Sequence, residues 1–429
     1  MVELKKGVGL IGVVTLGAGV AIGVSVFTVF QPAAQVAGSG LLVALALAAL
    51  PMLPFALAYA YLAAIYPVSG ASYEWPRRYL HPTIGFAIAW MRIIANVGVQ
   101  VILAQVFAQY LNMVIEVPTK VVMGILITSV FVLNYIGVSV AARTQTFLMG
   151  LLLLALAVFV ITGLPHVSME RIGAPLSAGW PAIGACVVLM ITLFMGIESA
   201  VEIGEEVQNG RRTIPLGIAI AVGMTTIVYG LVAFVALGVV GPERLAASSV
   251  PILEAARGPM GAFAVPLIVT AALVSVLKSM NANALVFSRS VFAMARMSAI
   301  PAVLGHVHPK LGTPSAAIIA CWSAAMLGLL LPSSLIFLLI AVNIPTMLKY
   351  AACSLSAIGA SRQPAPEGTK PLLGRRAIHV IGTAGALAAL AIIIASFGAD
   401  WRPHLLVGGW LAIGLVYHFF TRGRAPAAA

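Results

Sequence analysis

Long apolar runs dominate this chain, and short polar connections separate them. A helix that crosses the hydrocarbon core of a bilayer needs about 20 largely apolar residues. The pattern therefore predicts an all-α membrane protein of about twelve transmembrane helices, and the short connections place residues 1–429 in a single domain. The predicted spans lie at residues 8–32, 40–65, 84–113, 120–137, 143–164, 180–206, 213–240, 261–290, 314–331, 333–358, 376–397 and 403–420.

Composition and charge agree with a surface covered by lipid. Hydrophobic residues make up 61% of the chain and charged residues only 8%, whereas soluble proteins carry about 25% charged residues. The net charge is +12, but the basic residues recur in short loops and form no basic face or tail, so a nucleic-acid partner is not expected. Because most of these residues fall in alternate loops, the pattern predicts an inner-membrane protein with both termini in the cytoplasm.

Glycines interrupt the first and the sixth apolar runs. The first run contains Gly17, Gly19 and Gly23, and the sixth contains Gly196. Close packing of neighbouring helices through small residues is one interpretation. The other is a pair of broken helices at matching places in two halves of the chain, which is typical of a transporter with its site near the bilayer midplane.

Broken helices would expose backbone groups that need partners within the membrane. The N–H groups near Gly23, Val24 and Ser25 are suited to a carboxylate. The carbonyl groups near Ala21 and Ile22 and those near Phe194 and Met195 are suited to an ammonium group. Together the two kinds of group describe a site for an α-amino acid. The candidate substrate-binding residues of the two segments are Ala21, Ile22, Gly23, Val24, Ser25, Phe194, Met195, Gly196 and Ile197.

At these segments the chain resembles the amino acid–polyamine–organocation (APC) permeases. Residues 23–27 (GVSVF) resemble that family's GSGIF element, with Val24 and Ser25 as departures. Residues 196–215 resemble its G-[FVY]-E-S-A…E-E-x-x-N-P-x-R-x-I-P run, with Gly210 in place of the usual proline. The stretches at 67–73 and 288–314 resemble its helix 2–3 and helix 8–9 loops, so the resemblance covers roughly residues 8–358.

The resemblance implies a LeuT-type fold in which helices 1 and 6 are broken. Two inverted five-helix repeats would occupy residues 8–165 and 180–358, followed by two peripheral helices at 374–421. The implied activity is secondary active transport by alternating access, and we expect proton-coupled symport or exchange of a neutral amino acid. A permease for an acidic amino acid, an organic amine or a polyamine is the alternative, and sodium is the alternative coupling ion.

Ionisable residues at membrane depth are costly and are usually functional or paired. Several proton-coupled or sodium-independent members of the family carry a lysine in helix 5, where this chain has none; Lys278 lies in helix 8 instead. One hypothesis is that Lys278 takes the place of a bound cation and releases a proton during the cycle. The other is a structural ion pair with Glu198 or Glu202. The candidate coupling and gating residues are Lys278, Ser275, Ser279, Glu198 and Glu202.

Polar residues on helices 3, 8 and 10 are candidates for the wall of the pocket: Asn96, Gln100, Asn281, Asn283 and Asn343. At the position of Asn283 the arginine–agmatine exchanger, which this chain also resembles, carries a tryptophan, so a guanidinium substrate is less favoured. Arg92 and Lys349 are expected to extend toward the membrane interface. An acidic substrate becomes more attractive if Arg92 and Lys278 both reach the pocket.

The sequence contains no catalytic or metal-binding constellation and no nucleotide motif, so we expect no enzyme activity, no metal and no cofactor. A membrane-embedded enzyme or a non-transporting sensor is a distant alternative, since only Glu198 and Glu202 approach a convergent pair of carboxylates. The expected partners are a small-molecule substrate, the lipid bilayer and the coupling ion. The sequence does not define an oligomeric state.

Overall fold

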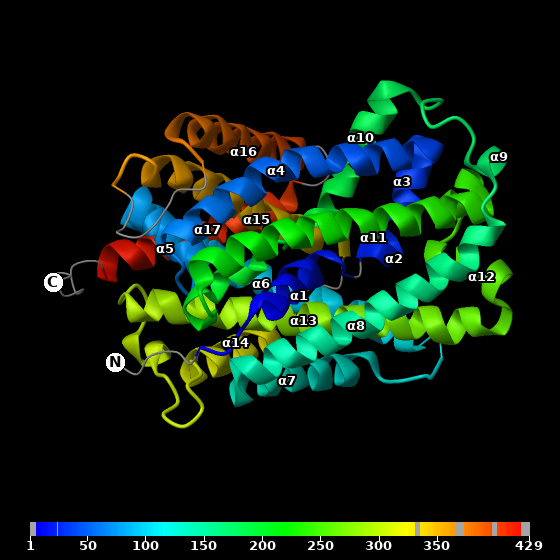
Figure 1. The fold of residues 1–429 in the computed structure, drawn as a ribbon. Helices are drawn as coiled ribbons and strands as arrows, with labels where there is room; N and C mark the ends of the chain where they lie inside the picture. The colour runs from blue at the N-terminus through cyan, green and yellow to red at the C-terminus, as the bar shows by residue number, and fades with distance from the viewer. Residues whose placement is uncertain are drawn as a thin grey trace.

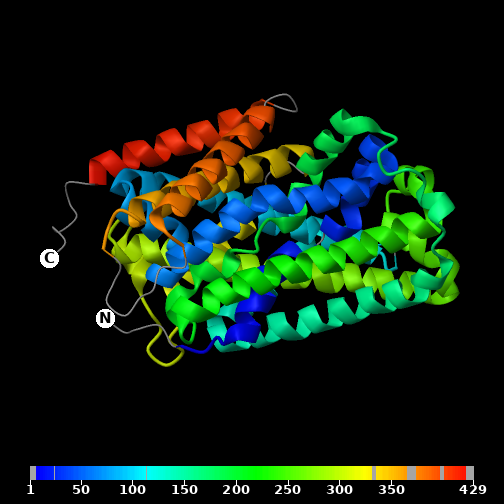
Figure 2. The ribbon, with the colours of Figure 1, turned by 45° about the horizontal axis from the view of Figure 1, so that its top comes forward.

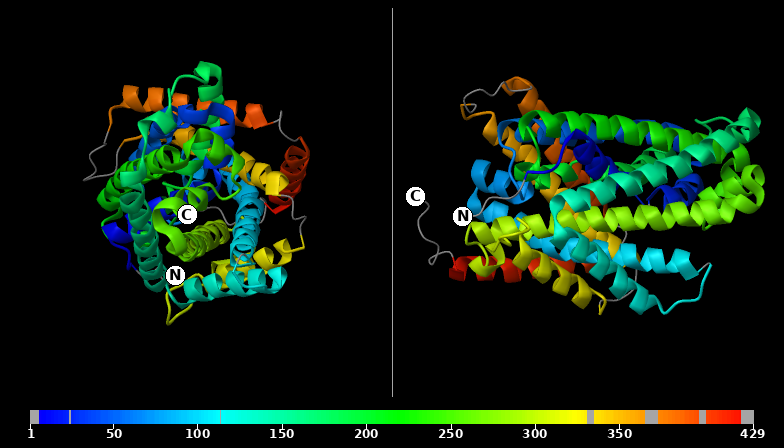
Figure 3. Two further views of the ribbon diagram at one scale, coloured as in Figure 1. Left: turned by 90° about the vertical axis from the view of Figure 1, so that its right-hand side faces the viewer. Right: turned by 60° about the horizontal axis from the view of Figure 1, so that its bottom comes forward.

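The computed structural model describes residues 6–23, 25–112, 114–330, 335–364, 373–396 and 401–421. These ranges form helices that run side by side along one axis (Figures 1 and 3). Outside the helices, the described residues contain only two isolated bridges, which pair Val8 with Val207 and Ser69 with Ile203. In the described chain, ten helical segments are long and apolar enough to cross a membrane, which confirms the predicted all-α membrane class.

The first five predicted spans correspond to helices near the expected bounds. The first span is divided among α1 (Leu10–Ala21), α2 (Ser25–Thr28) and α3 (Phe30–Ala37). The next four are α4 (Leu41–Ile65), α6 (Pro82–Asn112), α7 (Thr119–Ile136) and α8 (Val138–Gly163). Short elements that the apolar pattern did not predict are η1 (Gly38–Gly40), α5 (Ala71–Tyr79), η2 (Leu164–His166) and α9 (Met169–Ile172).

The sixth span combines α10 (Gly179–Ile191) with the 3₁₀ turns η3 (Thr192–Phe194), η4 (Ser199–Glu202) and η5 (Gly204–Glu206). The later predicted spans are α11 (Gly210–Ala247), α13 (Ala264–Arg296), α14 (Ser315–Gly328), α15 (Leu335–Ala360), α16 (Arg375–Ser396) and α17 (Arg402–Thr421). Between them lie α12 (Pro251–Met260), η6 (Gly261–Phe263) and η7 (Ala302–Gly305). The predicted division at 331–333 lies outside the described residues.

Local sequence explains where the seventh span ends. Within α11, Gly241 has φ 78° and ψ 167°, so the helical backbone is broken there, and Pro242 follows. Glycine adopts positive φ without steric cost, and proline cannot donate the next helical hydrogen bond. The span predicted at 213–240 therefore stops where this Gly-Pro pair turns the chain.

The first segment lies at the centre of the bundle. Helix α1 packs against α8, α11 and α13 and against the 3₁₀ turns η3 and η4 of the sixth span. Helix α13 packs in addition along α6. The two interrupted segments, although far apart in sequence, are therefore neighbours. Helix α13 contacts both of them, and α6 packs along α13.

The last two helices lie along one side of the bundle (Figure 2). Helix α16 packs on α15 and α4, and α17 packs on α15 and α6. At one end of the molecule lie α5, the end of α17 and the loop after α13, and at the other end lie α3, α9 and α12 (Figure 1). The connections thus separate into two sets at opposite ends.

Candidate functional site

The first segment is not a continuous α-helix. Helix α1 ends at Ala21, Ile22 and Gly23 form a bend, and α2 begins at Ser25. The amide of Gly23 donates to the carbonyl of Ala21 at 2.7 Å, a turn much tighter than an α-helical hydrogen bond. Val24, a candidate carboxylate ligand, lies outside the described residues. Because α2 has only four residues, its contribution as a helix dipole is small.

The sixth segment leaves helical geometry at the predicted place. After η3, Met195 is extended, with ψ 130°, and Gly196 has φ 101°. The amide of Gly196 donates to the Glu198 carboxylate at 3.1 Å and to the Tyr350 hydroxyl at 3.2 Å. The absence of a side chain at Gly196 lets Val20 of α1 pack directly on this turn. Gly196 thus allows both the turn of the backbone after η3 and the close packing of α1 on that turn.

We expect Gly196→Ala to destabilise the protein by about 1–3 kcal/mol, because an L side chain is strained at this positive φ and its Cβ would overlap Val20. Thermal unfolding of the purified protein in detergent measures the change. Gly223→Ala is the matched control, since it lies within α11 with open space at its Cβ position. Equal unfolding temperatures for the two variants would contradict this account of Gly196.

The two interrupted segments share one internal cavity of about 180 Å³. This volume is below the roughly 300–1,000 Å³ typical of sites for drug-sized ligands, and it suits a small solute. Helices α6, α13 and α15 complete its wall. The predicted residues that it brings together are Gly23, Ser25, Met195, Gly196, Glu198, Glu202, Ser279, Asn283 and Asn343.

Other predicted residues are buried beside the cavity without lining it, namely Ala21, Ile22, Phe194, Ile197, Asn96, Gln100, Asn281, Ser275 and Lys278. Several of them connect helices: the backbone carbonyl of Asn96 accepts from Asn283 at 3.1 Å, and Gln100 donates to the carbonyl of Met280 at 3.0 Å. Asn281 points the other way, toward the carbonyl of Ala141 at 3.0 Å.

Lys278 binds the backbone of the first segment. Its ammonium group donates to the carbonyl oxygens of Gly19 and Ile22, the latter at 2.7 Å, and the side chain is fully buried. The hydroxyl of Tyr229 donates to the carbonyl of Ala21. Two carbonyls that we expected to receive a substrate's ammonium group therefore already bind side chains of the protein, which leaves that role to the sixth segment.

The serines near Lys278 lie on one face of α13. The hydroxyl of Ser279 donates to the carbonyl of Ser275 at 2.9 Å, one helical turn away, and Ser279 also lines the cavity. The hydroxyl oxygen of Ser275 is buried and has no hydrogen-bond partner among the described residues. Ser279, next to Lys278 on α13, therefore lies between the contacts of Lys278 and the cavity.

Lys349 requires a correction. We expected it to extend to the membrane interface, but only 4% of it is exposed, and its Nζ lies 2.6 Å from the Glu198 carboxylate. The Tyr350 hydroxyl donates to the same carboxylate at 2.9 Å. Glu198 thus pairs with Lys349 and not with Lys278. The rotation of α15 about its axis turns this lysine inward. The distance of Lys349 from the end of the helix does not reveal that rotation.

Arg92 also reaches the cavity, contrary to the expectation that it extends to the interface. Three further residues of α6, Asn96, Val99 and Leu103, follow Arg92 at spacings of four, three and four. Such spacing places all four on one helical face. The spacing groups these residues on one face but does not show that this face lines the cavity. The cavity residues Ser199, Thr346 and Tyr350 were also missed by the sequence analysis.

Three carboxylates connect the second half of the sixth segment, residues 202–206, to neighbouring helices. Glu202 binds the hydroxyl and amide of Ser72 in α5. Glu206 and Arg289 form a fully buried ion pair, with Nε–Oε1 and Nη2–Oε2 distances of 2.8 and 3.0 Å. The third carboxylate is that of Glu205, which pairs with Arg296, a second arginine of α13.

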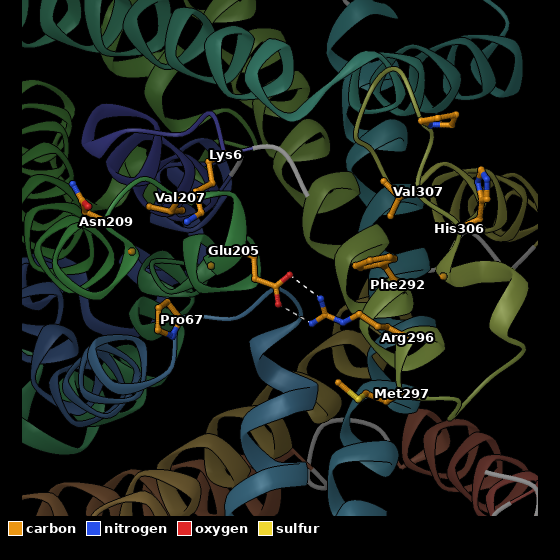
Figure 4. A pocket seen from close by; sticks show the side chains of 14 residues that line it. Lys6, Pro67, Glu205, Val207, Asn209, Phe292, Arg296, Met297, His306 and Val307 are labelled. Carbon is orange, nitrogen blue, oxygen red and sulfur yellow. Dashed lines mark hydrogen bonds and ion pairs between the residues drawn. The ribbon is translucent and has the colours of Figure 1, made fainter. Parts of the chain in front are cut away.

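The ion pair of Glu205 and Arg296 lines a second, larger cavity of about 1040 Å³. Figure 4 shows Glu205 and Arg296 pointing toward one another, and their closest atoms are 2.7 Å apart. Glu202 lines the small cavity and Glu205 the large one. Residues 202–205 therefore separate the two cavities and connect the sixth segment to α5 and α13.

Comparison with known proteins agrees with this architecture. The family profile described as amino acid permease matches residues 8–419. An uncharacterized transporter of Mycobacterium tuberculosis is 33% identical over 315 residues, which cover 73% of this chain and 71% of the relative.

Two relatives with named solutes are more distant. The branched-chain amino acid permease of Bacillus subtilis is 26% identical over 97% of this chain and 93% of its own length. The cystine/glutamate transporter of Pongo abelii is 26% identical over 76% of this chain and 68% of its own length.

Proposed function

The chain belongs to the amino acid permease family, and on this premise we propose that it carries an α-amino acid across the membrane by alternating access. The family match confirms the APC resemblance and makes the chain a multi-pass membrane transporter and not an enzyme. One observation carries the proposal: the interrupted segments at Gly23 and Gly196 line the same small cavity. Backbone groups that leave helical geometry at membrane depth need polar partners, and a zwitterion supplies both kinds.

In this proposal the substrate's carboxylate lies toward Gly23 and Ser25, and its ammonium group lies toward Met195 and Gly196. The opposite assignment is less favourable, because the carbonyls of Ala21 and Ile22 already bind Tyr229 and Lys278. The sequence predicted a neutral amino acid, and the branched-chain permeases among the relatives support this class. The acidic alternative is favoured by Arg92, which lines the cavity, but not by Lys278, which is buried outside it.

We assign the coupling step to the proton and to Lys278. Its ammonium group bridges α13 to carbonyls of the first segment, which is the position expected of a bound cation. Loss of the proton would remove the charge and weaken both contacts, so that the first segment is released from α13. Ser275 and Ser279 flank this position on the same helix.

Alternating access follows from the proposed division of the chain into inverted repeats at 8–165 and 180–358, with peripheral helices at 374–421. The interrupted segments would move against a scaffold that includes α6 and α13. In this proposal the contacts of Glu202, Glu205 and Glu206 close the inner side, and they must open to release the solute. We propose the inner membrane as the location, with both termini in the cytoplasm, because the end that carries α5 and the loop after α13 is rich in arginine.

The test is uptake into proteoliposomes from a panel of labelled amino acids, with and without an inward pH gradient or sodium gradient. We expect accumulation of at least one α-amino acid, driven by the pH gradient. The decarboxylated amine of that amino acid should not be transported, because it lacks the carboxylate for the first segment. Binding of an amino acid without any flux would support the sensor alternative and contradict the proposal.

A further inference from the structure

The wall of the small cavity contains four charged side chains. Arg92, Glu198, Glu202 and Lys349 all line it. The Lys349 ammonium and the Glu198 carboxylate form an ion pair at 2.6 Å, with side chains that are only 5% and 4% exposed. These two charges therefore compensate each other within the protein.

Glu202 is held by a different element. Its carboxylate binds the hydroxyl of Ser72 and accepts from the Ser72 amide at 3.4 Å, and its own backbone carbonyl accepts from the amide of Gly70 at 2.9 Å. These contacts direct Glu202 toward α5. Among the described residues, no ion pair joins it to a cation of the cavity.

Arg92 and Glu202 each have only neutral partners, and Arg92 is the one of the two cations that forms no ion pair among the described residues. One guanidinium nitrogen donates to the Thr346 hydroxyl at 3.0 Å, and another donates to the Asn96 side-chain oxygen at 2.8 Å. Thr346 in turn donates to the carbonyl of Val342 at 2.8 Å. Within the described ranges, Arg92 forms no ion pair with a carboxylate.

A guanidinium group has five N–H donors in a fixed fork, and it binds a carboxylate through two parallel hydrogen bonds. Thr346 and Asn96 fix the position of this fork at the cavity wall without neutralising it. Enclosing it under an aliphatic side chain would remove water from a charge that has no counterion, which is unfavourable. A cationic side chain beside Arg92 would add a second positive charge without a counterion.

We propose that Arg92 binds a carboxylate on the substrate's side chain, so that the cavity selects a dicarboxylic amino acid of the size of aspartate or glutamate. This inference rests on the proposed function, because the α-carboxylate and α-ammonium groups are assigned to the interrupted segments. Val99 and Leu103, which continue the Arg92 face of α6, contact the methylene groups between the two ends. Arg92 is thus the residue that determines specificity.

The experiment compares uptake of labelled L-glutamate, L-aspartate, L-glutamine and L-leucine into proteoliposomes under one pH gradient. The wild type should prefer an acidic substrate over glutamine. Arg92→Gln should lower the specificity constant for the acidic substrate by about 10- to 100-fold, the value of a hydrogen bond to a charged group, and should leave glutamine little changed. Arg92→Lys keeps the charge but loses the fork, so its loss should be intermediate. Arg257→Gln, on the exposed part of α12, is the control for removing one positive charge.

A wild type that prefers leucine, or an Arg92→Gln variant that loses all substrates equally, overturns this inference and leaves amino-acid transport intact. Absence of uptake for every amino acid overturns the proposed function as well. Should Arg92→Gln not fold, ligand-dependent thermal unfolding of the wild type decides the question, because a ligand that binds the folded state raises its stability. Stabilisation by glutamate or aspartate over glutamine supports the inference, and the reverse order contradicts it.

Discussion

Lys278→Gln is expected to abolish the response of uptake to a pH gradient. The lysine ammonium donates to two carbonyls of the interrupted first segment, and our coupling hypothesis requires it to release a proton. A glutamine amide can still donate a hydrogen bond but has no proton to release in the cycle. For one coupled proton, a gradient of one pH unit supplies about 1.4 kcal/mol, equivalent to a roughly tenfold accumulation, and the variant should show none.

Lys278→Arg tests the same step from the opposite direction. A guanidinium keeps its charge throughout the cycle, so this variant should hold the first segment against α13 and slow turnover, whereas the glutamine variant should still permit exchange without accumulation. Lys120→Gln, at the exposed start of α7, is the matched control. Unaltered pH dependence in Lys278→Gln would remove this residue from the coupling mechanism. The Glu198–Lys349 ion pair, which lines the cavity, would then be the next candidate for the coupling site.

Arg289→Met is expected to be the most destabilising of the charge substitutions. Arg289 and Glu206 are both fully buried and bind each other through two hydrogen bonds. Removing one partner leaves the other charge buried without compensation, which costs about 3–5 kcal/mol. Unfolding of the purified protein in detergent by heat or denaturant measures this loss.

The Glu205–Arg296 pair provides the comparison, because its side chains are 29% and 22% exposed. Exposed pairs contribute about 0–1 kcal/mol, so Arg296→Met should have a small effect on stability. A double variant, Arg289→Met with Glu206→Gln, should recover much of the stability lost by Arg289→Met alone, because no charge is then left unpaired. If the double variant is no more stable than the single one, the cost lies in packing and not in charge.

The sequence by itself determined the class of the protein and the places where its helices are interrupted. Apolar runs of membrane length predict spanning helices because an α-helix pairs its backbone groups within the segment, as lipid requires, and α4, α6, α7 and α8 begin and end close to the predicted bounds. The breaks at Gly23 and Gly196 were readable because glycine is costly inside a helix. The family resemblance then supplied the expected role of both segments.

Only the tertiary structure decided which charged side chains face the cavity. Arg92 and Lys349 lie on helices α6 and α15, which are mostly apolar because lipid and protein interior both favour apolar residues. Such helices carry no amphipathic pattern to show which face is turned inward. Contacts among α6, α13, α15 and the interrupted segments set that rotation, and they place Lys278 on the carbonyls of the first segment and Lys349 on Glu198.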